Sequence, residues 1–135
     1  MTRSTLTAPA AFMATAVASV MGVAPGHAQT AEAATFVTMD EISVPIVDTA
    51  RIDGVLRIRI VLQAHDTDGA AILARRMPEL RAASLAAAIE FARLHASPFT
   101  PVDVRKLTAT LAPTLRGVDA NIAKVLIVKV SALAA

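Results

Sequence analysis

The chain contains no cysteine, tryptophan or tyrosine. Because the thiolate is the reactive form of cysteine and the ligand of zinc–thiolate sites, this absence excludes thiol catalysis and such metal centres. Aromatic residues make up only 3% of the sequence. They leave no stacking platform of the kind that binds single-stranded nucleic acid, so we expect no nucleic-acid partner.

Glycine is also scarce after the first 28 residues, where it occurs only as Gly54, Gly69 and Gly117. Three isolated glycines cannot build a phosphate-binding loop, which excludes the common nucleotide-binding motifs. The 13 basic and 11 acidic residues nearly balance, for a formal net charge of +2. The chain as a whole therefore has no strong electrostatic field that would attract a polyanion.

The first 28 residues have the three-part layout of a secretory signal peptide. Arg3 precedes an uncharged run over residues 8–24, and Pro25 breaks that run before small residues that end at Ala28. We expect cleavage after Ala28, with a second candidate site after Ala33, and export to the periplasm. The alternative is an uncleaved anchor in the inner membrane, facing the periplasm, because the run would reach about 25 Å as a helix.

Residues 29–35 are small and polar, and we interpret them as a flexible lead-in. The remaining residues, 36–135, are enough for one domain.

Residues 55–65, VLRIRIVLQAH, carry the clearest structural pattern in the chain. Aliphatic side chains recur at every second position, while Arg57 and Arg59 fall on the opposite side. A period of two with β-branched residues predicts a half-buried antiparallel strand. A lone strand cannot bury its aliphatic face, so the flanking sequence must supply a covering layer.

A strand is predicted before it, at residues 42–47, where aliphatic residues alternate with Ser43 and Pro45. Proline cannot donate to a ladder hydrogen bond, so this strand belongs at a sheet edge or next to a bulge. Asp53 and Gly54 are predicted to form the turn that joins the two strands into a hairpin.

A closing strand is predicted at residues 124–132. Because it is apolar on both faces, we expect it to lie deeper than the strand at 42–47. The side chains expected to share its first face are those of Leu126, Val128, Val130 and Ala132.

The sequence between these strands is rich in helix-forming residues. Asp66 and Asp68 suit the start of a short helix that runs to about Met77, and Pro78 predicts a restart as a longer helix. The apolar stripe expected on the longer helix consists of Leu80, Ser84, Ala87, Phe91 and Leu94.

A further helix is predicted from a cap at Thr100, with Pro101 in its first turn. Pro113 is expected to kink or divide it, and Gly117 to mark an early end. Its expected apolar face consists of Val104, Leu107, Leu111, Leu115 and Val118. The order strand, strand, helix, helix, strand predicts an α+β fold with a small antiparallel sheet and helices packed on one face.

Chemistry-bearing residues are few. His65 with Asp66 and Asp68 is a weak metal-binding pattern, and a strand-end turn followed by a helix cap is the favoured interpretation. Glu79 and Glu90 would be about 16 Å apart along a helix, too far for a paired-carboxylate mechanism. We therefore predict a protein that is not an enzyme, with no catalytic residue, cofactor or metal site.

Arginines form the one candidate interaction surface. Those of the helical region can bind anionic lipid or an acidic partner, although a solvated face with Glu79 neutralising a neighbour is the commoner arrangement. The candidate residues are Arg57, Arg59, Arg75, Arg76 and Arg81.

The order of these features resembles the flagellar basal body-associated FliL family. The matching pieces are ISVPIV at 42–47, LRIRIVLQ at 56–63, RRMPELRAASLAAAI at 75–89, VRKLTATLAPTL at 104–115 and VLIVKV at 125–130. The segment around Pro78 is the most specific of them.

This resemblance implies a periplasmic domain similar to the stomatin and prohibitin type, tethered to the inner membrane and able to form homo-oligomeric rings. It implies stator or rotor components as protein partners and a role in torque and swimming. The alternative is a soluble periplasmic binding or scaffold domain of the same fold without a flagellar role, because the N-terminal run looks like a cleavable signal.

Overall fold

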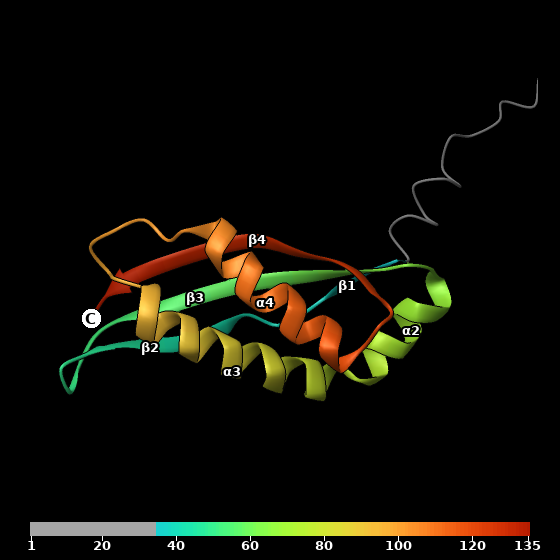
Figure 1. Ribbon diagram of the computed structural model, residues 1–135, viewed down its shortest axis with the longest axis horizontal. Coiled ribbons are helices and arrows are strands. Elements are labelled where there is room, and N and C mark those ends of the chain that lie inside the picture. The colour runs from blue at the N-terminus through green and yellow to red at the C-terminus, as the bar shows by residue number, and fades with distance from the viewer. Residues whose placement is uncertain (1–34) are drawn as a thin grey trace, which may run out of the picture.

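The computed structural model describes residues 35–135, in which an antiparallel sheet carries three helices on one face (Figure 1). This confirms the predicted α+β fold class. The predicted signal peptide or anchor at 1–28 lies outside the described residues, as does nearly all of the lead-in. Within the described part, no helix has the length and apolar character needed to cross a membrane.

The central strand of the sheet is β3 (Arg51–Ala64), which contains all of the predicted strand except His65 and begins a few residues earlier. β4 (Ile122–Ala134) runs antiparallel along one edge of β3, from the pair Gly54–Ala134 to the pair Ala64–Ile122. The last strand of the chain therefore joins the sheet beside the strand that shows the clearest sequence pattern.

The other edge of β3 is shared by β1 (Phe36–Thr38) and β2 (Ile42–Asp48), which pair with it one after the other. Between them, the Met39 backbone N–H donates to the carbonyl of Ile60 at 3.0 Å. β2 lies at the sheet edge and has a register shift after Ile46. The prediction that Pro45 places this strand at an edge or a bulge is confirmed.

The hydrophobic core lies between the helices and one face of the sheet. α3 (Met77–His95) packs against β2, and α4 (Val104–Val118) packs against both α3 and β4. The aliphatic face of β3 is buried there, as its alternation predicts, and its buried side chains are Leu56, Ile58, Ile60, Leu62 and Ala64.

The first two helices follow the predicted pattern. α2 (Thr67–Arg75) is capped by Asp66, whose carboxylate accepts a hydrogen bond from the Gly69 backbone N–H at 2.6 Å. Only Arg76 separates α2 from α3 (Met77–His95). Pro78 lies in the first turn of α3, where its missing N–H breaks no hydrogen bond of the helix. The prediction that Leu94 belongs to the apolar stripe was wrong, because this residue is 56% exposed and the buried stripe ends at Phe91 and Ala92.

The last helix, α4 (Val104–Val118), starts later than predicted. Asp103 is its cap and accepts from the Lys106 backbone N–H at 3.1 Å, so the assignment of Thr100 as cap was wrong. The helix is not divided at Pro113, and it does not end before Gly117. The exposed position of Pro113 keeps the proline ring out of the core contacts, which are made by three leucines, Leu107, Leu111 and Leu115.

The hairpin turn also lies elsewhere than predicted. Thr49 and Ala50 take the positive backbone φ angles of the turn, 45° and 75°, whereas Asp53 and Gly54 already belong to β3. Gly54 is needed for another reason. A Cβ atom at this position would lie 2.3 Å from the carbonyl oxygen of Leu133 on β4.

β4 departs most from its predicted pattern. A bulge leaves Val128 without a partner, so that Lys129 pairs with Arg59 and Ile127 pairs with Ile60. Leu126 therefore lies on the opposite face from Val130, against the prediction that the two share one. The predicted deep placement is also wrong, because β4 is an edge strand and is less buried than β2.

A buried hydroxyl in the core gives a first testable expectation. Ser84 of α3 is fully buried, and within residues 35–135 its Oγ atom has no hydrogen-bond partner. Ser84→Ala should raise the free energy of unfolding by about 1 kcal/mol, because it removes an unsatisfied polar group and adds helix propensity. Urea denaturation measures this, with exposed Ser43→Ala as the control. A loss of stability in Ser84→Ala would contradict this account of the core.

Candidate functional site

The face of the sheet opposite the helices is the strongest candidate for a functional surface. Figure 1 shows the helices gathered on one side of the strands. Cross-strand partners share a face, so the pairing of β3 with β2 and β4 identifies the other side, which we call the open face. Its side chains on these strands are Ser43, Pro45, Val55, Arg57, Arg59, Val61, Gln63, Lys124, Leu126, Lys129, Ser131 and Leu133.

Positive charge is concentrated in the middle of the open face. Arg59 lies directly opposite Lys129, and Arg57 lies two residues farther along β3. Like charges on directly opposed positions repel, so this pair costs a little stability in the free protein. Glu41 offsets part of that charge through an ion pair with Arg59 at 3.6 Å. The remaining charge favours an anionic partner.

The arginines of the helical region do not extend this surface, and two of them have structural contacts. Arg76 lies between α2 and α3, where its guanidinium binds Glu79 and donates to Asp119 Oδ2 at 2.9 Å and to the Val118 carbonyl at 3.0 Å. These contacts join the start of α3 to the end of α4. They agree with the expectation that Glu79 neutralises a neighbouring arginine.

Arg81 forms hydrogen bonds with backbone carbonyl groups and not with an acidic side chain. Its guanidinium donates to the carbonyls of Asp40 at 2.9 Å and Glu41 at 3.2 Å, which ties α3 to the segment between β1 and β2. Arg75 is exposed on α2 and has no ion pair within the described residues. Of the five arginines predicted as one surface, only Arg57 and Arg59 therefore lie together.

Asp119 is the most perturbed carboxyl group in the described part of the chain. Its pKa lies below the ordinary value, first because the Asn121 backbone N–H donates to it at 2.9 Å. The Asn121 side-chain amide and the Arg76 guanidinium lower the pKa further, while burial opposes them. The carboxylate is the form that these three donors stabilise.

Stability should depend on pH through Asp119. Because its folded pKa is lowered, the contribution is present above the ordinary pKa of about 4 and is lost as the pH falls through the folded value. Asp119→Asn should lower the free energy of unfolding by about 1–2 kcal/mol at pH 7. The gap to the wild type should close as the pH falls below about 4, as measured by urea titration. With Asp40→Asn as the control, a gap that is absent at pH 7 or stays constant in acid would contradict this role.

The remaining histidine and glutamate side chains considered as candidates have positions or contacts that fit a structural role. His65 is exposed beside the Asp66 cap, as the favoured interpretation predicted. Glu90 pairs with Arg93 at 2.7 Å, and His95 lies against the ring of Phe91 at a centroid distance of 5.5 Å. Among residues 35–135, no group of three or more histidine, aspartate or glutamate side chains is placed to hold a metal ion.

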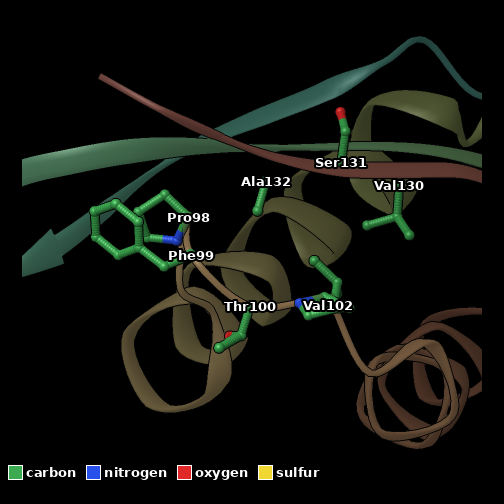
Figure 2. A pocket seen from close by; sticks show the side chains of 8 residues that line it. Pro98, Phe99, Thr100, Val102, Val130, Ser131 and Ala132 are labelled. Atoms are coloured by element: carbon green, nitrogen blue, oxygen red, sulfur yellow. The ribbon is translucent and has the colours of Figure 1, made fainter.

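A cavity of about 540 Å³ lies between β4 and the loop that leads from α3 to α4 (Figure 2). Its walls are Val130, Ser131 and Ala132 on the strand and residues 98–102 on the loop. Sequence reasoning missed it, because the loop residues had been assigned to a helix start. It also missed Lys124 and Lys129 on the open face, since only the pairing of β4 with β3 places Lys129 opposite Arg59 and Lys124 opposite Gln63.

Comparisons of the chain with protein-family models, with curated proteins and with solved structures found no match.

Proposed function

We propose that the protein is a non-enzymatic accessory of the flagellar basal body that supports the stator and motor during swimming. The observation that carries the proposal is the arrangement around Pro78. The Met-Pro-Glu-Leu-Arg segment opens α3 directly after α2, and the Val-rich closing strand pairs with the central strand. These are the pieces, in the same order along the chain, on which the resemblance to the FliL family rests.

The open face supplies the surface that such a role requires. An accessory acts by holding partners, and Arg57, Arg59 and Lys129 give this face a net positive charge that Glu41 offsets only in part. The helices pack against the other face of this sheet, and strand pairing sets the backbone positions from which the charged side chains extend. A protein partner with an acidic patch gains both faster association and a defined orientation from such a surface.

Deletion of the gene tests the proposal in cells. We expect swimming speed and spreading in soft agar to fall while the growth rate in liquid medium stays normal, and a plasmid copy to restore motility. Normal swimming of the deletion strain, or a natural host that has no flagella, would refute the flagellar role.

The second candidate is a soluble periplasmic binding or scaffold domain of the same fold, favoured by the signal-like first 28 residues. Fractionation distinguishes the two. Mature protein that begins near Gln29 and is free in the periplasm supports the scaffold. Full-length protein in the membrane fraction supports the tethered accessory.

A further inference from the structure

The outer edge of β4 has two halves that differ in their hydrogen bonding. The Ala135 N–H donates to the Asp53 carbonyl at 2.9 Å, and the neighbouring pair is Gly54–Ala134. In an antiparallel ladder, hydrogen-bonded and non-hydrogen-bonded pairs alternate. Up to the bulge, every second residue counted back from Ala135 therefore bonds to β3. The residues between them, Val130, Ala132 and Ala134, direct their N–H and C=O groups away from β3.

Near the start of β4, the outer edge is capped. A second bulge leaves Ala123 without a partner on β3, and its carbonyl accepts a hydrogen bond from the Arg116 guanidinium at 3.1 Å. In the other half of the edge, no hydrogen bond from the described residues reaches the outward groups of Val130 or Ala132. This half is therefore free to pair with another strand.

The cavity of about 540 Å³ lies beside this free half. Figure 2 shows the side chains of Val130 and Ala132 directed toward the loop, with Ser131 directed to the opposite side. The loop wall includes Val102 and Phe99, and the Phe99 side chain is 81% exposed. A strand added next to β4 would point alternate side chains into this cavity, which favours apolar residues at those positions.

The opposite side of an added strand would meet different chemistry. Its intervening side chains would lie beside Ser131 and Lys129 on the open face, with Arg57 and Arg59 one strand farther in. Lys129 has no ion pair within the described residues. A carboxylate on the added strand next to Lys129 would relieve the repulsion between Lys129 and Arg59.

We propose that the edge of β4 around Val130 and Ala132 binds an extended segment of a partner protein in which apolar and acidic residues alternate. The segment adds one strand to the sheet. Its apolar side chains enter the cavity, and its carboxylates lie against the basic residues of the open face. This goes beyond the flagellar proposal, since it applies equally to a scaffold domain, and its test does not depend on motility.

A labelled heptapeptide of alternating valine and glutamate is a suitable probe. Fluorescence anisotropy with the purified protein should give saturable binding, and the matching peptide of valine and lysine should bind at least tenfold more weakly. Lys129→Glu should reduce this preference, while Arg57 and Arg59 remain on the open face. No binding of either peptide, or equal binding of both, would overturn the proposal.

Ala132→Pro tests the backbone pairing directly. Proline removes the outward N–H at a position whose N–H makes no ladder bond to β3, so the sheet should remain folded. We expect at least a tenfold loss of affinity for the glutamate peptide. Ser131→Ala, in which the backbone N–H faces β3, is the matched control and should bind like the wild type. Equal affinity of Ala132→Pro and Ser131→Ala would contradict strand addition.

Amide hydrogen exchange gives a readout that needs no substitution. In the free protein the amides of Val130 and Ala132 should exchange quickly while that of Ser131 is protected, and the glutamate peptide should protect all three. If these two amides instead exchange slowly in the absence of peptide, and their protection increases with protein concentration, a second copy of the chain occupies the edge. That result would refute the proposed partner segment.

Discussion

Ile58→Ala is expected to lower the free energy of unfolding by about 3–4 kcal/mol, close to the typical loss for a buried aliphatic side chain truncated to alanine. Ile58 is completely buried at the centre of the sheet, where it pairs with Ile42 on β2 and Val130 on β4. The helices cover this face of the sheet, so neighbouring side chains can fill little of the space that the truncated side chain leaves.

Arg57→Ala is the matched control for this substitution. It truncates the adjacent residue of the same strand, but the Arg57 side chain is exposed on the open face. We expect its unfolding free energy to stay within about 0.5 kcal/mol of the wild type, as for most surface substitutions. Urea denaturation of the two variants measures the difference. Equal losses at Ile58 and Arg57 would mean that the helices do not cover the assigned face.

Gly54→Ala is the second substitution with a large expected effect, a loss of about 3 kcal/mol, at the upper end for overpacking. The added Cβ would lie 2.3 Å from the Leu133 carbonyl oxygen and 3.0 Å from the Cβ of Pro98. Backbone on β4 must shift to relieve the first contact. Pairing at the end of the β3–β4 ladder would weaken as a result.

Gly117→Ala makes the same chemical change in the opposite setting. Gly117 lies within α4, and a Cβ built there has no neighbouring atom within 4 Å. Alanine should stabilise the protein by about 0.5–1 kcal/mol through its helix propensity. Thermal melts of the two variants should therefore move in opposite directions. A neutral Gly54→Ala would contradict the close approach of β3 and β4 at this point.

The parts of the fold that could be predicted from sequence rest on local patterns. The alternation in β3 identified its buried face, and Pro78 identified the start of α3, because both depend on residues a few positions apart. The turn at Thr49 and Ala50 could not be found in this way. Neither residue type favours positive φ. The turn was predicted at Gly54 because glycine is common in turns, but this glycine is required by the close approach of the Leu133 carbonyl on β4.

The candidate site was only half predictable for a similar reason. Arg57 and Arg59 follow from the period of β3, but Lys129 joins them only through the register in which β4 pairs with β3, with Lys129 opposite Arg59. The period of a single strand cannot fix the register between two distant strands, and it cannot locate the bulge at Val128 that moves Leu126 to the open face.

The structural roles of two predicted arginines also depend on distant contacts. Arg76 and Arg81 carry charge that the sequence marks as available for a partner. Apart from Glu79, which the sequence did indicate for Arg76, their partners lie about forty residues away in the chain, at Asp119 and at the segment that contains Asp40 and Glu41. Only the fold brings these groups together, so sequence spacing could not separate them from Arg57 and Arg59.

The swimming speed of cells that carry Arg57→Glu together with Arg59→Glu in place of the wild type tests the central claim most directly. That claim is that the protein supports motility through the basic open face. If it holds, swimming should fall to the level of the deletion strain while the variant accumulates to the wild-type amount, and Arg75→Glu at the same amount should swim normally. Wild-type swimming of the double variant would contradict it.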